Sequence, residues 1–323
     1  MSRQGEAAAD RPLLVAYRAL GLGDFLTAVP ALRALARAFP GHRRVLAAPE
    51  AIAPLAALAG AFDAVVDSAP LAPLPAALQG PDVAVNLHGR GPQSHRILLA
   101  ARPRRLIAFA CEAVAGPRWR AGEHEVARWC RLLAECGIAA DPRELDLLAP
   151  GAGAQGVRGA TVLHPGAASA ARRWPLERWA AVARAERAAG RTVLVTGGAA
   201  ERAAAERVAT AAGLGAERVL AGRTDLLGLA RVVAAAGRVA CGDTGVAHLA
   251  TAFGVPSVVL FGPTPPAEWG PPADRPQHRA LWTGGRGDPH AAEPDPGLLA
   301  IATGDVIAAL EALPEAPARR LAA

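Results

Sequence analysis

The sequence predicts an α/β protein with parallel sheets arranged in two domains. Short runs of β-branched residues alternate with helical patterns along the whole chain, which is typical of parallel strands joined by helices. The 323 residues suffice for two domains of ordinary size. A segment rich in glycine and alanine, 149–159, lacks periodicity and indicates a linker. We therefore expect an N-terminal domain over 1–150 and a C-terminal domain over 151–323, with a cleft between the carboxyl ends of their sheets.

The composition is that of a globular cytoplasmic protein. Hydrophobic residues make up 52% of the chain and charged residues 20%, which excludes a disordered chain. No stretch resembles a signal peptide, and two prolines and a glutamate interrupt the most apolar window, 45–62, which argues against a transmembrane helix. The four cysteines have neither CxxC spacing nor a histidine-rich neighbour, so we expect free thiols in a reducing compartment. We predict a cytoplasmic location, and leave open a peripheral one at the inner face of the cell membrane.

The chain contains no lysine, since all 35 basic residues are arginine, and its formal net charge is +6. A Walker A phosphate loop needs its lysine and a Schiff-base enzyme needs a lysine amine, so both classes are excluded. Arginine stays charged at any relevant pH and can bind a phosphate through two nitrogens. The absence of lysine therefore does not exclude an anion-binding site.

Arginines are concentrated between residues 96 and 120. The segment holds Arg96, Arg102, Arg104, Arg105, Arg118 and Arg120 against the single acid Glu112, and six minus one gives a local charge of +5. One interpretation is a solvated basic surface, and the other is a patch for an anionic acceptor or a membrane surface. We expect no nucleic-acid partner, because aromatic residues make up only 4% of the chain and no known binding motif occurs.

The first series of elements follows a polar segment, 1–11. A helical pattern over 22–39 comes after the first strand and stops at a proline and a glycine, 40–41. Pro30 lies inside this pattern and lacks an N–H, so we expect a kink or a later helix start there. The other elements predicted in this half are strands at 12–17, 44–47, 64–66, 82–87 and 105–109 and a helix at 123–136.

The second series follows the linker. The predicted strands are 160–164, 192–196, 219–220, 238–241 and 257–260, and the predicted helices are 176–189, 199–212, 226–236 and 244–253. The segment 262–297 is rich in proline and glycine, which indicates a long loop. A last helix, 304–313, could pack back on the N-terminal domain.

Gly21, Gly23 and Asp24 lie between the first strand and the first helix. The third glycine of a GxGxxG fingerprint is absent, because position 26 is leucine, so the motif gives little support to a dinucleotide-binding fold. Asp24 occupies a position from which a carboxylate projects from the top of a sheet into a cleft. It is either an N-cap or a general base that takes a proton from an acceptor hydroxyl.

The segment 164–175 combines small residues with two arginines. It begins with His164 at a strand end and ends at the proline that opens a helix. Glycine and alanine allow close approach of a ligand, and Arg172 and Arg173 can neutralise a diphosphate leaving group. The alternative is an exposed pair of arginines on a loop.

The most informative segment, 241–264, is a strand–turn–helix–strand unit whose turn holds small residues and Asp243. Small residues let backbone N–H groups approach a ligand, and a helix N-terminus favours an anion, so the turn predicts a phosphate site. The alternative is an ordinary turn with Asp243 or Thr244 as N-cap. His248 lies four residues after Thr244 on the same helix face. It either reaches the same ligand or is a half-buried structural histidine.

A further strand–turn–helix crossing contains two glycines and Glu201. Glu201 either complements the dipole of the helix or accepts hydrogen bonds from ribose hydroxyls. No DxD sequence occurs anywhere in the chain, so metal-clamped nucleotide-sugar chemistry is not supported. We expect neither a metal nor a cofactor.

Taken together, these segments resemble glycosyltransferase family 9, the heptosyltransferases that use ADP-heptose. The segments are GLGDFLTAVPALRAL (21–35), HPGAASAARRWPLERW (164–179), VTGGAAER (195–202) and GDTGVAHLATAFGVPSVVLFGPT (242–264). The resemblance implies a GT-B fold, which has two Rossmann-like domains with parallel sheets facing a central cleft. It also implies that the first domain recognises the acceptor and that the second binds most of the nucleotide sugar.

The resemblance also implies roles for individual residues. Asp24 matches the catalytic base, Glu201 matches an acid that contacts the nucleoside, and Arg172 stands where the family usually has a lysine that contacts the diphosphate. Arginine keeps that charge but changes its geometry. Ala167 and Ala168 stand where some heptosyltransferases carry hydroxyl residues near the phosphates. The complete predicted set is Asp24 and Arg172 as catalytic residues; Gly23, Ala167, Ala168, Glu201, Thr224, Asp243, Thr244, Gly245 and His248 for the donor; and His88, Arg90, Arg118 and Arg120 for the acceptor.

The predicted function is that of a metal-independent, inverting glycosyltransferase. We expect it to move a sugar, namely heptose, from a nucleotide-diphosphate donor, namely ADP-heptose, to a hydroxyl of a glycan, a glycolipid or a small natural product. Two alternatives stay open: a nucleotide-sugar epimerase of the same architecture, and a non-catalytic protein that binds sugar nucleotides.

Overall fold

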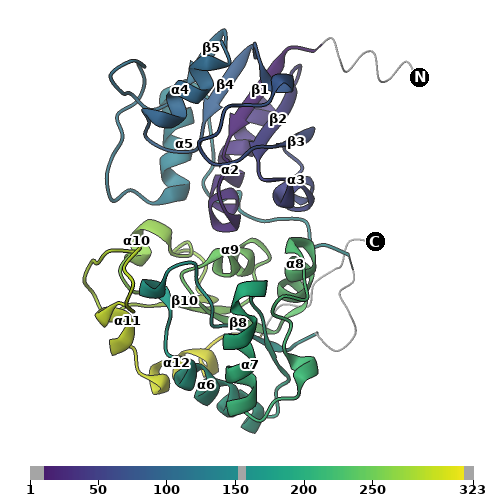
Figure 1. Ribbon diagram of the computed structural model, residues 1–323, viewed down its shortest axis with the longest axis vertical. Coiled ribbons are helices and arrows are strands. Elements are labelled where there is room, and N and C mark those ends of the chain that lie inside the picture. Colours follow the sequence, from purple (N-terminus) through teal and green to yellow (C-terminus); the bar gives the residue numbers. More distant parts are fainter. Residues whose placement is uncertain (1–10, 152–157, 316–323) are drawn as a thin grey trace. The chain divides into compact units, whose positions relative to one another are not determined.

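The computed structural model describes residues 11–151 and 158–315, and these divide into two compact units (Figure 1). The first unit ends at Leu145 and the second begins at Asp146. Each unit contains a five-stranded sheet whose neighbouring strands all pair in parallel. The predicted class, α/β with two Rossmann-like halves, is confirmed. Residues 1–10 of the expected polar start and 152–157 of the expected linker lie outside the described residues.

The N-terminal unit alternates strands and helices along the chain. They are β1 (Leu13–Tyr17), α2 (Leu22–Ala38), β2 (Arg43–Ala48), α3 (Ala53–Ala59), β3 (Ala64–Asp67), β4 (Val83–Asn86), α4 (Gln93–Ala100), β5 (Arg105–Ile107) and α5 (Glu125–Glu135). The strand order in the sheet is β3-β2-β1-β4-β5. After β1 the chain builds one side of the sheet and then crosses to the other, so a topological switch point lies between β1 and β4.

The C-terminal unit repeats this plan with a longer series of elements. They are β6 (Thr161–His164), α6 (Leu176–Ala188), β7 (Val193–Val195), α7 (Arg202–Ala211), α8 (Leu226–Ala235), β8 (Arg238–Gly242), α9 (Gly245–Ala252), β9 (Ser257–Leu260), α10 (Pro266–Trp269), β10 (His278–Leu281), α11 (Pro296–Ala300) and α12 (Thr303–Glu311). The strand order is β10-β9-β8-β6-β7, which places the switch point of this sheet between β6 and β8.

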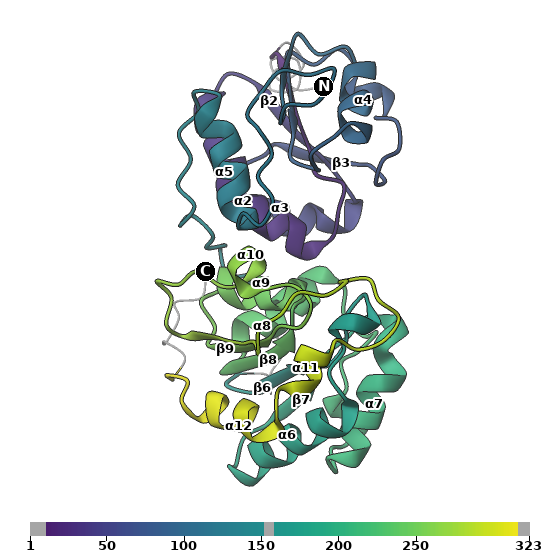
Figure 2. The same cartoon turned by 90° about the vertical axis from the view of Figure 1, so that its left-hand side faces the viewer.

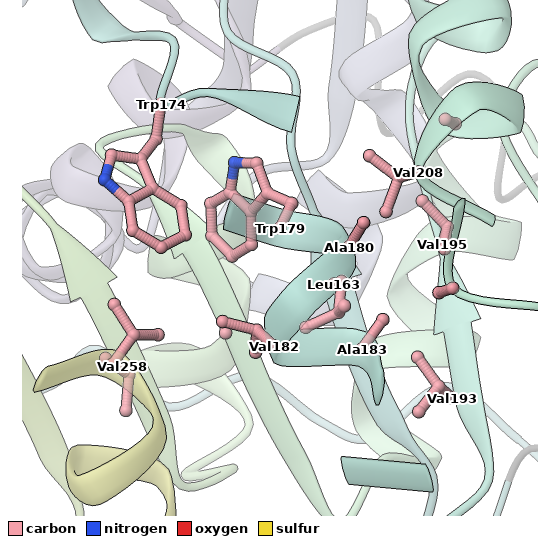
Figure 3. Packing of buried hydrophobic residues seen from close by; sticks show 14 of the residues in the cluster. Leu163, Trp174, Trp179, Ala180, Val182, Ala183, Val193, Val195, Val208 and Val258 are labelled. Atoms are coloured by element: carbon pink, nitrogen blue, oxygen red, sulfur yellow. The ribbon is translucent and has the colours of Figure 1, made fainter. Parts of the chain in front are cut away.

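The central strands are apolar throughout because helices cover both faces of a parallel sheet. All residues of β4, β6 and β9 are buried. In the C-terminal unit, Trp174 and Trp179 meet edge to face with ring centroids 5.1 Å apart, and they share a cluster with Leu163 of β6 and Val182 of α6 (Figure 3). The buried Trp174 thereby anchors the loop that carries Arg172.

Three expectations about the elements were wrong. α2 starts at Leu22 and includes the buried Pro30, so of the two alternatives given for Pro30, a kink or a later helix start, the later start is wrong. The predicted strand 219–220 is reduced to one isolated bridge between Val219 and Val195. The predicted loop 262–297 contains α10, β10 and the start of α11. The strand β10 has only four residues between proline-rich and glycine-rich segments, and it is stabilised by its parallel pairing with β9, which no local pattern reveals.

The helix α12 belongs to the C-terminal unit, where it packs beside α6 and contacts β9 (Figure 2). The four cysteines are free thiols, as predicted. Among the described residues, no helix has the length and apolar character that crossing a membrane requires.

Candidate functional site

Several predicted site residues follow the strands that flank the two switch points. In the N-terminal unit Asp24 comes after β1 and His88 after β4. In the C-terminal unit Asp243 comes directly after β8, next to the loop that leaves β6. Ligands of open parallel sheets bind at such points, because loops and helix N-termini leave a crevice there. The predicted residues thus form two groups, one in each unit.

Asp24 is the third residue of α2, whose N-cap is Gly21. The N-cap interpretation of Asp24 is therefore wrong. Its side chain is 29% exposed, and a carboxylate in the first turn is favoured by the helix dipole. Gly23, which we predicted to bind the donor, lies in the same turn of the N-terminal unit.

A buried arginine holds the Asp24 carboxylate in place. Arg18, the residue after β1, is 1% exposed. Its Nε donates to the backbone oxygen of Asp24 at 2.9 Å, and its Nη2 donates to Asp24 Oδ1 at 3.2 Å. Its Nη1 donates to the backbone oxygen of Leu87, directly after β4. Arg18 therefore ties the start of α2 to the end of β4 across the switch point.

A second carboxylate lies beside Arg18. Glu125, the first residue of α5, accepts from Arg18 Nη2 at Oε1, 2.9 Å away, and its Oε2 pairs with Arg128. Neither Arg18 nor Glu125 was predicted as a site residue. The sequence carries a signal for Arg18 alone, since it is a charged residue directly after an apolar strand. Its pairing with Glu125 could not be predicted, because the two residues are 107 positions apart.

The electrostatics of this group favour proton transfer at Asp24. Burial raises the pKa of the Asp24 carboxyl above its ordinary value, Arg18 opposes that rise, and Glu125 adds to it. A higher pKa makes the ionised carboxylate a stronger base. The carboxylate accepts hydrogen bonds from Arg18 and from the backbone N–H groups of Gly21 and Asp24, and its side chain is still 29% exposed, so it can take a proton from a hydroxyl.

His88 lies at the same switch point and stacks on Tyr17, with ring centroids 4.5 Å apart and planes 15° from parallel. Burial and the nearby Arg18 lower the pKa of His88 to about 4, so its ring is neutral near pH 7. Its Nδ1 is buried and has no hydrogen-bond partner among the described residues. The residue as a whole is half-buried, and a neutral imidazole can donate or accept a hydrogen bond.

The three arginines predicted to bind the acceptor are exposed. Arg120 pairs with Glu135 at 3.3 Å, whereas Arg90 and Arg118 make no ion pair within the described parts of the chain. Exposed pairs of this kind contribute little to stability, so Arg120 can exchange its partner for an anionic ligand.

In the C-terminal unit, Arg172 meets the residue that precedes the N-cap of α9. Its Nη1 donates to the backbone oxygen of Asp243 at 3.1 Å and lies 3.8 Å from Asp243 Oδ2. The side chain of Arg172 is 24% exposed, so part of the guanidinium can still reach a ligand. Burial raises the pKa of Asp243 to about 6, although Arg172 counteracts the rise. The interpretation of Arg172 and Arg173 as a merely exposed pair does not hold for Arg172.

The turn before α9 offers backbone donors. Thr244 is the N-cap of α9, but its side chain makes no capping hydrogen bond. Its Oγ1 is buried beside the Cys241 thiol and has no nitrogen or oxygen partner among the described residues. The first N–H groups of a helix lack partners inside the helix, so those that follow Thr244, from Gly245 onward, can bind an anion. His248 is half-buried and meets the ring of Trp269 edge-on at 6.0 Å.

Glu201 and His164 form a polar pair beside this turn, at the ends of the neighbouring strands β7 and β6. Glu201 Oε2 accepts from the Gly198 N–H at 2.7 Å and lies 3.9 Å from His164 Nε2. His164 Nδ1 lies 3.0 Å from Thr196 Oγ1. A side chain at Gly166 would overlap the Glu201 carboxylate, so this glycine keeps the space open. His164 and Thr196 were not predicted as site residues, although each is the last residue of a predicted strand.

The remaining predicted donor residues lie on loops of the same unit. Ala167 is buried and its backbone oxygen accepts from Arg173 Nε at 2.9 Å, whereas Ala168 is exposed. Thr224 is half-buried directly before Asp225, the N-cap of α8. Arg173 therefore holds the loop after β6 through the backbone of Ala167, whereas the Arg172 guanidinium is left partly exposed.

Solved structures share this fold over nearly the whole chain. ADP-heptose lipopolysaccharide heptosyltransferase II of E. coli has a TM-score of 0.73 at 20% identity, and the match covers 93% of this chain and 98% of that one. A family 9 glycosyl transferase of Veillonella parvula has a TM-score of 0.73 at 18% identity, with 94% and 97% covered. The E. coli heptosyltransferase WaaC, solved with ADP, has a TM-score of 0.69 at 19% identity, with 93% and 99% covered. At these identities the likeness shows the fold alone.

Sequence comparison identifies the family. Lipopolysaccharide heptosyltransferase 1 of Pseudomonas aeruginosa is 45% identical over 94 residues, which make up 29% of this chain and 26% of that protein, so the match spans about a quarter of this curated relative. A family model described as glycosyltransferase family 9 (heptosyltransferase) matches residues 107–284, more than half of the chain and most of the site in the C-terminal unit. The chain therefore belongs to glycosyltransferase family 9, the heptosyltransferase family.

Proposed function

We propose that this protein is a metal-independent, inverting glycosyltransferase that moves heptose from ADP-heptose to a hydroxyl of an acceptor. The observation that carries the proposal is the Arg172 guanidinium, bonded to Asp243 just before the start of α9 and at the switch point of the sheet. A positive side chain beside free helical N–H groups is suited to a diphosphate. Family membership and the ADP bound to the related E. coli enzyme support the choice of donor.

The donor is held by charge and by the backbone. The N–H groups after Thr244 and the Arg172 guanidinium bind the diphosphate, and no cation is needed to neutralise it. Glu201 accepts hydrogen bonds from the ribose hydroxyls at the neighbouring strand end, where Gly166 leaves room for its carboxylate. The nucleoside then extends from the start of α9 toward β7.

The reaction is a single displacement. The Asp24 carboxylate takes the proton of the acceptor hydroxyl while the hydroxyl oxygen attacks the anomeric carbon on the face opposite the diphosphate. The bond from the anomeric carbon to the diphosphate oxygen breaks, and ADP leaves with the bonding electrons, stabilised by Arg172. The configuration at the anomeric carbon inverts, and the proton ends on Asp24. The half-buried, neutral imidazole of His88 contributes to binding of the acceptor.

The acceptor is a glycan, a glycolipid or a small natural product. A lipopolysaccharide-type glycolipid is supported by the name of the Pseudomonas aeruginosa relative, lipopolysaccharide heptosyltransferase 1, and Arg90, Arg118 and Arg120 would bind its anionic groups. Binding to such a lipid would place the protein in the cytoplasm at the inner face of the membrane.

A panel of nucleotide sugars tests the proposal. The purified protein is incubated with ADP-heptose, ADP-glucose and UDP-glucose, with and without candidate glycan acceptors, and the products are identified by mass spectrometry and NMR. Release of ADP with heptose transferred to an acceptor or to water supports the proposal. A sugar nucleotide of unchanged mass and altered configuration would instead indicate an epimerase, and tight binding without turnover would indicate a binding protein.

A further inference from the structure

The Arg18 side chain forms a bridge between two carboxylates of the N-terminal unit. One nitrogen, Nη2, lies 3.2 Å from Asp24 Oδ1 and 2.9 Å from Glu125 Oε1. The other nitrogens of the guanidinium donate to the backbone oxygens of Asp24 and Leu87. Because Arg18 is buried and held at three nitrogens, it cannot turn toward one carboxylate without losing the other.

Glu125 is itself held by three donors. Its Oε1 accepts from Arg18 Nη2 and from Trp129 Nε1, both at 2.9 Å, and its Oε2 pairs with Arg128. The guanidinium of Arg128 lies over the ring of Trp119, 4.2 Å from its centroid, and that of Arg18 lies over Trp129 at 4.7 Å. The aromatic rings shield these charges from water, which strengthens the interactions among them.

We propose that Glu125 is a positioning residue for Asp24, acting through the shared guanidinium of Arg18. The proposal rests on the proposed function in one respect, since it assumes that Asp24 is the base. We call the chain of contacts from Glu125 through Arg18 to Asp24 the relay. Because Glu125 lies on α5 and Asp24 on α2, the position and charge of the Asp24 carboxylate depend on the packing of these two helices.

The charges that surround Asp24 predict opposite effects for two substitutions. Arg18 faces Asp24 from the end of β1, and Glu125 faces it from α5 with Arg128 behind. His88, on the β4 side, is neutral near pH 7. Removing the Glu125 charge leaves Arg18 to act on Asp24 alone, so Asp24 should release its proton at a lower pH. Without the Arg128 charge, Glu125 has only Arg18 as a cationic partner and attracts it more strongly. The interaction of Arg18 with Asp24 weakens, so Asp24 should titrate at a higher pH.

The test is a titration of Asp24 followed by NMR. Protein labelled with ¹³C at the aspartate carboxyl carbons is titrated, and the Asp24 signal is assigned by its absence from Asp24→Asn. We expect the midpoint of Asp24 to move down in Glu125→Gln and up in Arg128→Gln. Glu186→Gln is the matched control, because Glu186 is a buried carboxylate of the other unit that is bonded to Thr161. Its substitution should leave the Asp24 midpoint unchanged.

Two results would overturn the proposal. One is an unchanged Asp24 midpoint in a folded Glu125→Gln protein. The other is a shift of the same sign in Glu125→Gln and Arg128→Gln, which would indicate a general loss of structure instead of a relay. If Glu125→Gln fails to fold, Arg128→Gln decides, because an Asp24 midpoint that does not rise in this folded variant would overturn the proposal.

An activity arm separates the relay from the proposed function. With ADP-heptose as donor, Glu125→Gln should lower kcat by roughly 10-fold or more, with KM for the donor little changed, and should move the acidic limb of the pH profile down together with the NMR midpoint. NMR shifts without turnover of any donor would leave the relay intact and contradict the function. A drop in kcat without any NMR shift would contradict the relay.

Discussion

Arg172 Nη1 lies 3.1 Å from the backbone oxygen of Asp243 and 3.8 Å from its carboxylate Oδ2. The same arginine therefore contacts the turn before α9 and an acid that is nearly buried. A diphosphate that binds at the start of α9 has to share Arg172 with this carboxylate. We expect the balance between the two anions to set the affinity for the proposed donor.

Replacing Arg172 by alanine should weaken binding of ADP and leave adenosine unaffected. A charge-assisted hydrogen bond contributes about 1.5–3 kcal/mol, or roughly 10–150-fold in Kd. Calorimetry with ADP and adenosine measures both affinities, and Arg184→Ala, an exposed arginine of α6, serves as the control. Equal losses for ADP and adenosine would show that Arg172 does not bind phosphate.

Binding of the diphosphate should strengthen as the pH falls through about 6. Burial raises the pKa of Asp243 to about 6, so below that pH the acid is protonated and no longer competes for Arg172. ADP-ribose is the suitable ligand, because its phosphates are diesters that do not titrate in this range. Asp243→Asn should remove the pH dependence of the Kd for ADP-ribose. The same pH dependence in wild type and variant would show that another group causes it.

The same acid should reduce the stability of the fold at neutral pH. The pKa of Asp243 is about 6 in the folded protein against an ordinary value of 3.8, so the free energy of unfolding falls as the pH rises between these values and stays low above them. Asp243→Asn should therefore raise the unfolding free energy at pH 7, by about 1–3 kcal/mol, with little gain near pH 4. Thermal melts at the two pH values measure this difference. An equal gain in stability at pH 4 and pH 7 would show that ionisation of Asp243 is not its cause.

Asp24→Asn should lower kcat by roughly 10²–10⁴-fold, the usual contribution of a general base. Donor affinity should hardly change, because the substitution leaves the diphosphate site intact. Asp63→Asn is a matched control, since Asp63 has a side chain 30% exposed against 29% for Asp24 and also pairs with an arginine. Near-normal turnover in Asp24→Asn would assign the base to another residue.

Activity should persist in excess EDTA. In the proposed reaction, Arg172 and the N–H groups at the start of α9 supply the positive charge that the leaving diphosphate requires. Initial rates with and without the chelator measure the effect. A loss that Mg²⁺ or Mn²⁺ restores would contradict a metal-independent reaction.

The sequence by itself determined most of the strands and helices and the positions of several site residues along the chain. A buried strand and an amphipathic helix are specified by residues close together in sequence, so their periodicity can be read directly. Asp24 after β1 and Asp243 after β8 were located in this way, because the carboxyl end of a parallel strand is where a ligand binds.

Only the tertiary structure decided which residues act on one another. Arg18 and Glu125 are 107 positions apart, Arg172 and Asp243 are 71 apart, and no local pattern pairs them. The strand β10 was missed for the same reason, since its hydrogen bonds come from β9. The raised pKa values of Asp24 and Asp243 also depend on burial by distant segments, because desolvation is a property of the packed fold and not of the neighbouring residues.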